Sequence, residues 1–222
     1  MKHIIRTAAM TAALVLTTST LSNAAMAEKE HAHVVTAAAT AVSATQINTQ
    51  GVLRDLWVEH VFWVRNYVIA SKASDENQRK TATDQVLANA TAISGAIASY
   101  YGKAAGDQML NLLAGHWGAV KDYSDATFAK DAKAQQNATE KLVANAKQIA
   151  AFLAKANPNL PEATLVGLLS SHGAHHLAQA QQIFKGDFKA EATTWTEMRV
   201  HMFMIADALT GALAKQFPEK FI

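Results

Sequence analysis

The segment LRDLWVEH at residues 53–60 decides the fold, because the same pattern returns twice further along the chain. MLNLLAGH follows at 109–116 and LVGLLSSH at 165–172, so the three segments superpose without a gap at one constant shift in the numbering. Each segment ends in a histidine: His60, His116 and His172. A period of this length is typical of a repeated supersecondary element. The sequence therefore predicts three copies of one element.

A second set of segments repeats at the same shift: VLANATAIS at 86–94, LVANAKQIA at 142–150 and MRVHMFMIA at 198–206. In both sets the apolar residues recur with i, i+3, i+4, i+7 spacing, which indicates amphipathic helices. Asp75, Asp131 and Asp187 lie between the two segments of each copy, where an aspartate suits the N-cap of the second helix. Each copy therefore predicts two helices joined by a turn.

The predicted fold is an all-α domain over residues 53–222, with six helices in three hairpins at 53–108, 109–164 and 165–222. We expect the hairpins to pack as one antiparallel bundle. A stacked helical-repeat solenoid is the alternative. The composition suits either arrangement, since 50% of the 222 residues are hydrophobic and only three are proline.

The N-terminal segment 1–27 predicts a secretory signal peptide rather than part of the fold. The basic stretch MKHIIR precedes a short apolar segment, and Ala25-Met26-Ala27 is a small-x-small cleavage signal. We therefore expect a periplasmic or secreted protein, cleaved after Ala27. The segment is too short and too rich in threonine to span a membrane, so no stable membrane insertion is expected after cleavage. Residues 28–52, rich in Ala, Thr, Ser and Gln, predict a flexible leader, and a short helix within it is the alternative.

Charge and cysteine content exclude several classes of protein. Cleavage would remove Lys2 and Arg6 from the 20 basic residues and none of the 18 acidic ones, which leaves a balanced chain. Such a balance does not predict a nucleic-acid partner. The chain has no cysteine, so disulfides, thiolate metal sites and cysteine catalysis are excluded. It also lacks a glycine-rich phosphate loop and a GxSxG motif, so we expect no nucleotide cofactor.

The histidines of the repeat fall into a polar layer. Positions equally far from the turn of a hairpin lie at equal height, which places six residues in one layer: His60, Asn89, His116, Asn145, His172 and His201. The neighbouring positions on the same faces are apolar. Buried polar groups cost free energy unless they are hydrogen-bonded or bound to metal. The layer is therefore either a hydrogen-bonded device that fixes packing register or a ligand site.

The third copy departs from the other two in the direction of metal binding. His176 replaces a valine and lies four residues after His172, a spacing that lets two rings reach one ion at about 2.0–2.1 Å. His201 replaces an asparagine. The candidate metal ligands are therefore His60, His116, His172, His176 and His201. Imidazole suits Cu, Zn, Ni or Fe. His175 lies off the main stripe and is expected to be partly exposed.

Three further residues are candidates for hydrogen bonds to the outer nitrogens of these rings: Asn89, Asn145 and Asp207. Asp207 could instead be an exposed helix acid. Glu59 directly precedes His60 and is expected to point away from the layer. Arg65 is expected to be a surface cation beside Glu59 or Asp55.

We expect a transition-metal-binding protein that acts in storage, buffering or stress defence, with a metal ion as its partner. A non-catalytic structural or interaction bundle, in which the polar layer only sets register, is the first alternative. A metalloenzyme is the second, and it would need an open coordination position. Since no catalytic motif is present, the sequence favours binding over catalysis.

Several stretches resemble a family of exported, uncharacterised bacterial all-helical proteins: LRDLWVEHVFWVR, SYYGKAAGDQ, LLAGH, FLAKANPNLP and IADALTGALAKQFPEKF. The resemblance covers residues 53–222 and implies an exported helical protein. Some members are labelled glycosyltransferases, but these residues contain no nucleotide-sugar fold and no acidic metal motif. The chain also departs from the family pattern, with Gln179 in place of an acid and Arg199 in place of a histidine.

Overall fold

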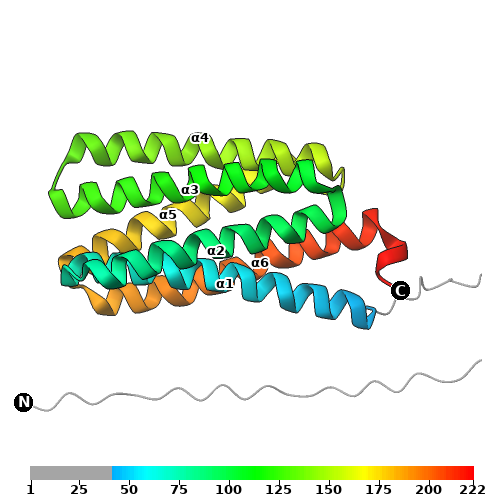
Figure 1. Cartoon of the computed structure of the whole chain (residues 1–222), viewed down its shortest axis with the longest axis horizontal. Coiled ribbons are helices and arrows are strands. Elements are labelled where there is room, and N and C mark those ends of the chain that lie inside the picture. Colours follow the sequence, from blue (N-terminus) through cyan, green and yellow to red (C-terminus); the bar gives the residue numbers. More distant parts are fainter. Residues whose placement is uncertain (1–41) are drawn as a thin grey trace, which may run out of the picture. The chain divides into compact units, whose positions relative to one another are not determined.

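The computed structural model describes residues 42–222, and this part of the chain contains helices and no strand. The six α-helices are α1 Ala44–Ala73, α2 Glu76–Tyr101, α3 Lys103–Ala129, α4 Ala132–Ala156, α5 Glu162–Lys185 and α6 Phe188–Gln216, followed by a 3₁₀ turn at Pro218–Lys220. The predicted all-α class with six helices is confirmed (Figure 1). The predicted signal peptide and residues 28–41 of the predicted leader lie outside the described residues.

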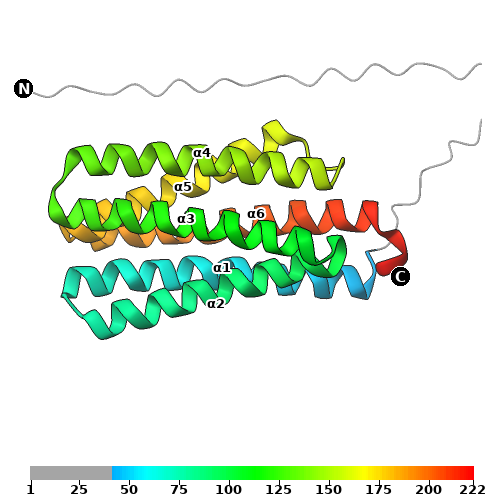
Figure 2. The same ribbon diagram turned by 45° about the horizontal axis from the view of Figure 1, so that its top comes forward.

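The six helices close into a ring. Each helix packs against the next one along the chain, and α6 returns to pack against α1. This closure differs from the stacked alternative, in which the first and last hairpins would not meet. Helices α1, α3 and α5 also contact one another, so they form the inner part of the domain, and α2, α4 and α6 lie outside them. Figures 1 and 2 show the α1–α2, α3–α4 and α5–α6 turns at the same end of the domain.

The helix ends at these three turns are capped in the same way. The first helix ends on a residue in the left-handed conformation, with φ of 57°, 59° and 76° at Ser74, Lys130 and Gly186. The next residue is the predicted aspartate, whose side chain accepts a backbone N–H of the first turn of the second helix. This hydrogen bond satisfies a donor that the helix itself cannot pair. The N-cap roles of Asp75, Asp131 and Asp187 are therefore confirmed.

Helix α1 begins at Ala44, so the predicted leader, which runs to residue 52, ends too late. Ser43 is the N-cap, and its side chain accepts the N–H of Gln46. Gln50, inside the predicted leader, donates to Asp207 on α6 at 2.8 Å. The apolar periodicity missed this part of the helix because Val52 and Ile47 are exposed and its contact with α6 is polar.

The outer and inner helices of each hairpin are joined by a hydrogen bond between residues 33 positions apart. Asn89 and Asn145 donate their side-chain N–H groups to Leu56 O and Leu112 O at 3.0 and 2.9 Å. His201 Nε2 lies 2.8 Å from Leu168 O. A carbonyl oxygen can only accept, so His201 carries a proton on Nε2. Each bond fixes the axial position of an outer helix against an inner one.

Two apolar clusters make up the core, and the histidine positions lie between them. The first cluster contains Trp57, Leu113 and Leu169, and the second contains Trp117 and residues further towards the α1–α2 turn end. His116, for example, lies between Leu113 of the first cluster and Trp117 of the second. No helix in residues 42–222 is long and apolar enough to cross a membrane.

The left-handed turn residue predicts a stabilising substitution. Lys130 is exposed and has a φ of 59°, a conformation that costs a residue with a Cβ about 1–2 kcal/mol. Lys130→Gly should therefore raise the free energy of unfolding by about 1 kcal/mol, measured by urea denaturation. Gly186→Lys should lower it by a similar amount, because Gly186 already occupies the equivalent place. If Lys130→Gly and the parent chain were equally stable, the left-handed conformation of Lys130 would not be strained.

The side-chain bond to Leu112 O predicts a destabilising substitution with a conservative control. Asn145→Ala removes a buried donor and leaves a small void, and should lower the free energy of unfolding by about 1–3 kcal/mol. Asn145→His should recover part of that loss, since His201 makes the same bond in the third hairpin. Urea denaturation of the two variants and the parent measures these differences in the free energy of unfolding. An alanine variant as stable as the parent would show that the bond contributes nothing.

Candidate metal centre

Four histidines meet at the centre of the domain, between α1, α3 and α5. His60, His116 and His172 come from one position on each of the three inner helices, and His176 lies one turn further along α5. They are 3%, 5%, 1% and 2% exposed. Each ring offers one nitrogen, and these four nitrogens lie within 4.8 Å of one another.

The rings are arranged as a compact tetrahedron. The ring centres of His60, His116 and His172 are 5.6, 5.6 and 5.2 Å apart. The centre of His176 lies 5.6, 5.7 and 4.4 Å from these three rings in the same order. Four imidazoles that bind one tetrahedral ion at about 2.0–2.1 Å would place their ring centres roughly 5 Å apart. The separations of the rings therefore already match a four-histidine site.

Hydrogen bonding leaves much of this cluster unsatisfied. His176 Nε2 and His172 Nε2 lie 3.1 Å apart, so one of them donates and the other accepts. Within residues 42–222, no protein group bonds to four other buried ring nitrogens: His60 Nε2, His116 Nε2, His172 Nδ1 and His176 Nδ1. An unpaired buried polar atom costs about 1–3 kcal/mol. Ligation of an ion would give some of these atoms a partner.

Burial keeps the four imidazoles neutral. Desolvation, with a smaller contribution from His116, lowers the pKa of His60 to about 3. Desolvation lowers the pKa of His116 to about 4. The pKa values of His172 and His176 also lie well below the ordinary value, first because of burial and then because the rings would repel one another if charged. Neutral imidazole is the form that binds a metal.

The donor set fits a transition metal ion. It consists of four imidazole nitrogens and includes no carboxylate, which suits Zn, Cu, Ni or Fe and does not suit Ca or Mg. A tetrahedral ion requires its nitrogens roughly 3.3 Å apart. His172 and His176 already meet that distance, and small rotations of His60 and His116 would bring the others closer.

His201, the fifth candidate ligand, lies outside this cluster. Its Nε2 is held by Leu168 O at 2.8 Å, and the residue is half-buried on α6. The predicted height of His201 along the bundle is correct. Its ring was predicted to join the other histidine rings, but it binds a backbone carbonyl instead. It takes the place that Asn89 and Asn145 have in the other hairpins, where a donor to a backbone carbonyl is required.

Of the three expected hydrogen-bonding partners of the rings, only Asp207 is committed entirely to other groups. The amide N–H groups of Asn89 and Asn145 donate to backbone carbonyls, and Asn89 also donates to Glu59 at 3.1 Å, whereas the side-chain oxygens of both asparagines have no partner in the described residues. Asp207 accepts two bonds from Arg54, at 2.8 and 2.6 Å, and one from Gln50. The role of Asp207 beside an imidazole is therefore wrong, since it forms an ion pair with α1. His175 is half-buried, as expected.

The sequence interpretation missed a buried acid. Glu191, 2% exposed on α6, accepts two bonds from Arg65 at 2.6 and 2.8 Å and one from Gln179 at 3.1 Å. Arg65 is therefore bound to a buried carboxylate and is not paired with Glu59 or Asp55. One available signal was the position of Glu191, which aligns with Arg79 and Gln135 in the repeat that the sequence predicts. Those two residues also take part in side-chain hydrogen bonds between helices.

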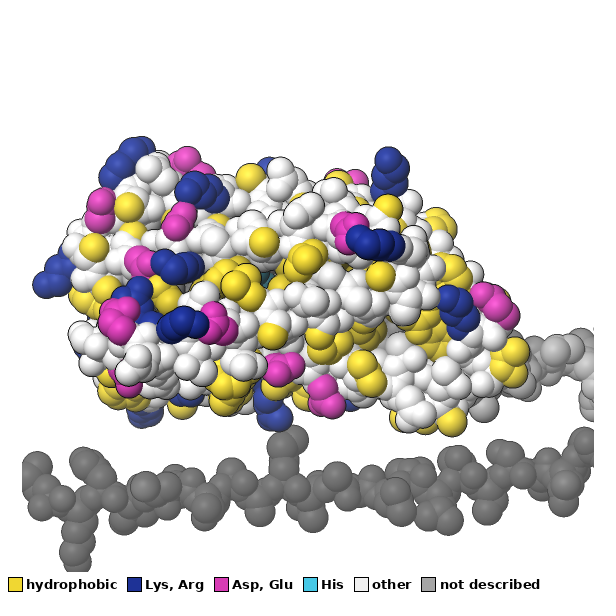
Figure 3. Space-filling view, in the orientation of Figure 1, with side chains coloured by type: hydrophobic (Ala, Val, Ile, Leu, Met, Phe, Trp, Pro, Cys, Tyr) yellow, Lys and Arg dark blue, Asp and Glu magenta, His cyan; other side chains and the backbone are white. Residues whose placement is uncertain are grey.

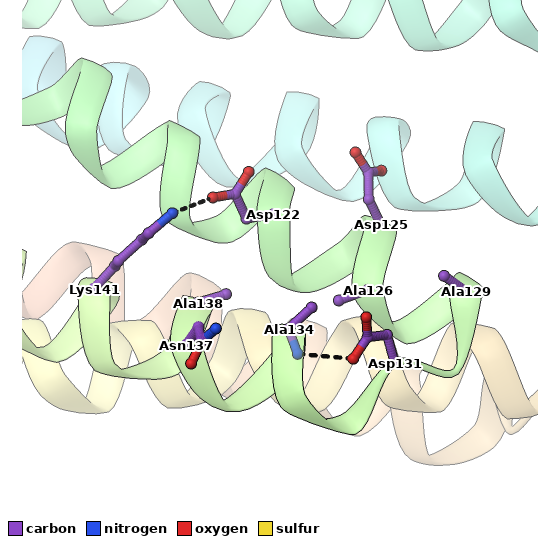
Figure 4. Close-up of a pocket in the computed structure, with 9 residues that line it drawn as sticks. All are labelled: Asp122, Asp125, Ala126, Ala129, Asp131, Ala134, Asn137, Ala138 and Lys141. Carbon is purple, nitrogen blue, oxygen red and sulfur yellow. Dashed lines mark hydrogen bonds and ion pairs between the residues drawn. The ribbon is translucent and has the colours of Figure 1, made fainter.

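An exposed groove of about 390 Å³ between α3 and α4 is a weaker candidate site. Its acidic residues already have partners in the structure. Asp122 pairs with Lys141, and Asp131 caps α4 by accepting the N–H of Ala134 (Figure 4). Asp125 accepts from Tyr67 and Lys121. On the face shown in Figure 3, acidic and basic side chains are interspersed. These features give the groove no free set of ligands comparable to the four histidines.

The lowered pKa values predict that acid destabilises the metal-free protein. In the unfolded chain these histidines titrate near pH 6.5, whereas His60 and His116 in the folded chain titrate near 3 and 4. Below pH 6.5 and above the folded-state pKa values, the unfolded state therefore binds more protons than the folded state. The free energy of unfolding is then highest above pH 6.5 and falls as the pH decreases through this range. Each histidine should contribute up to about 1.4 kcal/mol per pH unit.

Urea denaturation of the metal-free protein at pH 7.5, 6.0 and 5.0 measures this dependence. His116→Asn should reduce the slope, because one titrating group is gone. Stability that stays constant from pH 7.5 to 5.0 would show that the rings are not buried as neutral groups.

No protein-family model, no curated protein and no solved structure matches the chain. The resemblance to exported helical proteins therefore stays a prediction. Only the geometry and chemistry of the four buried histidines are left to indicate what the protein does.

Proposed function

We infer that the protein is a transition-metal-binding protein, exported to the periplasm or secreted, that holds one ion between its three inner helices. The observation that carries this inference is the meeting of four buried, neutral imidazoles whose ligand atoms lie within 4.8 Å of one another. Structural and catalytic sites both use histidine, but a cluster of four buried rings with four unpaired nitrogens in an apolar core has few other stable uses.

The coordination favours storage or buffering over catalysis. A catalytic metal keeps an open position for water or substrate, usually with three protein ligands. Four imidazoles fill a tetrahedral ion, and the residues that surround them belong to two apolar clusters. Substrate would have to displace a ligand from inside the core. An ion held in this way is sequestered from solvent.

We also propose that the domain consists of three sequence repeats, beginning at residues 53, 109 and 165, packed as antiparallel hairpins. Two features recur at that shift and support this interpretation: the capped turns at residues 74–75, 130–131 and 186–187, and the hydrogen bonds from Asn89, Asn145 and His201. In this view the repeat supplies three ligands by symmetry. His176 is then an addition of the third repeat, where Val64 and Val120 stand in the others.

One observation favours a second candidate, a structural bundle without ligand. The register of each hairpin is already fixed by the bond to Leu56 O, Leu112 O or Leu168 O, and these bonds need no metal. In such a bundle the four rings would be only a polar layer. It would leave the unpaired ring nitrogens without an explanation, whereas metal binding would give some of them a partner.

Metal titration of the purified protein tests the function. The parent chain, stripped with a chelator, should bind one equivalent of Zn²⁺ or Cu²⁺ and gain thermal stability, by about 2.7 kcal/mol when free metal exceeds the dissociation constant a hundredfold. His176→Val should weaken binding at least about tenfold, since one ligand is lost. Elemental analysis and native mass spectrometry give the stoichiometry.

The valine variant is a matched control for folding, because valine stands at the equivalent positions 64 and 120. It should unfold as cooperatively as the parent in the absence of metal. If the parent binds no metal and shows no thermal shift with Zn²⁺, Cu²⁺, Ni²⁺ or, under reducing conditions, Cu⁺, the structural bundle is the correct interpretation.

A further inference from the structure

Two more histidines lie beside the centre, towards the surface of the third hairpin. His175 on α5 and His201 on α6 are both half-buried, and their ring centres are 5.4 Å apart. His201 donates through Nε2 to Leu168 O, so its Nδ1 takes no part in that bond. In the described part of the chain, His175 Nδ1 is buried and has no hydrogen-bond partner.

This pair lies close to the buried cluster, because His201 is among the groups whose charge acts on His172, and His175 is among those that act on His176. His175 is adjacent in sequence to His176, and the carbonyl that holds His201 belongs to Leu168, one helical turn before His172. His176 and His172 are themselves in contact through their Nε2 atoms at 3.1 Å. Imidazole groups therefore lie both at the partly exposed contact of α5 and α6 and at the centre of the domain, and α5 carries residues of both sets.

The other two hairpins lack this continuation. The residues equivalent to His175 in the first and second repeats are Trp63 and Ala119, and those equivalent to His201 are Asn89 and Asn145. The asparagines make the same bond to a backbone carbonyl, so that bond does not require a histidine. The fold thus tolerates other residues at both places, and the two extra imidazoles need another explanation.

We propose that His175 and His201 form an outer docking point through which a transition metal ion reaches the four-histidine centre. This inference rests on the proposed metal-binding function. A hydrated ion cannot cross an apolar core, because desolvation of an uncompensated charge is prohibitive. Successive exchange of neutral imidazole ligands avoids that cost. The ion passes from the outer pair to His176 and His172, and then gains His60 and His116.

The experiment measures the rate of metal uptake separately from the final binding. Metal-free protein is mixed with Zn²⁺ held by a chromophoric chelator, and the release of the chelator is followed by stopped flow. The double variant His175→Ala/His201→Asn carries the residues found at the equivalent positions, so it should fold normally. It should take up Zn²⁺ at least about tenfold more slowly. Its final stoichiometry and metal-induced thermal shift should equal those of the parent.

Three outcomes overturn the docking point and leave the metal centre in place. The double variant could load at the parent rate, which would mean that the ion passes elsewhere or that the bundle opens. It could bind with reduced final affinity, which would make the two residues ligands of the centre. The variant Val200→Ala, an exposed change next to His201, is the control and should load at the parent rate. The third outcome is that this control loads as slowly as the double variant, which would show a general effect of altering α6.

Failure of the proposed function has a different signature, because the parent chain itself would then take up no Zn²⁺ from the chelator. A parent that loads rapidly and a double variant that loads slowly to the same end point support both the centre and its outer docking point.

Discussion

Burial of imidazole in an apolar core is the constraint on which the rest of the structure depends. His60, His116, His172 and His176 occupy the contact region of the three inner helices, with apolar clusters on either side. A core residue of this kind must find a partner or cost free energy. Because the inner helices supply the rings from equivalent heights, each ring faces other rings. The rings make only one hydrogen bond to one another, between His172 and His176. The buried ring nitrogens that have no hydrogen-bond partner are therefore open to a ligand.

The height of the layer is set by a second interaction outside it. Asn89, Asn145 and His201 hold backbone carbonyls of the inner helices one turn before the histidine that each inner helix contributes. A slip of an outer helix by one turn would break a buried hydrogen bond in its hairpin. The capped turns fix the other end of each hairpin, since the aspartate must follow the left-handed residue directly. Together these contacts position the rings without using them, which leaves the rings free for chemistry.

Sequence periodicity was sufficient for the six helices except the first turns of α1, for the turns, and for most of the site. The constant shift between the repeats placed the N-cap aspartates and brought four of the five candidate ligands together, because equal spacing on helices translates into equal height. It failed where lateral position matters. His201 lies at the predicted height but faces a carbonyl of α5, and only the packing of α6 on α5 decides that. Periodicity also could not find the pairs Asp207–Arg54 and Glu191–Arg65, since long side chains reach across helices in directions that spacing does not define.

The charge of the ligands limits which ion the centre can hold. All four groups are neutral and the cluster contains no carboxylate, so a bound ion would keep its full charge inside the core. The buried acid Glu191 does not compensate for it, because Arg65 already neutralises that carboxylate. The cost of burying charge rises steeply with its magnitude. A monovalent ion such as Cu⁺ is therefore penalised least, while a divalent ion is favoured only if imidazole coordination outweighs the desolvation cost or an anion accompanies it. If the centre binds metal, the same burial that keeps protons off the rings would also select the bound ion by its charge.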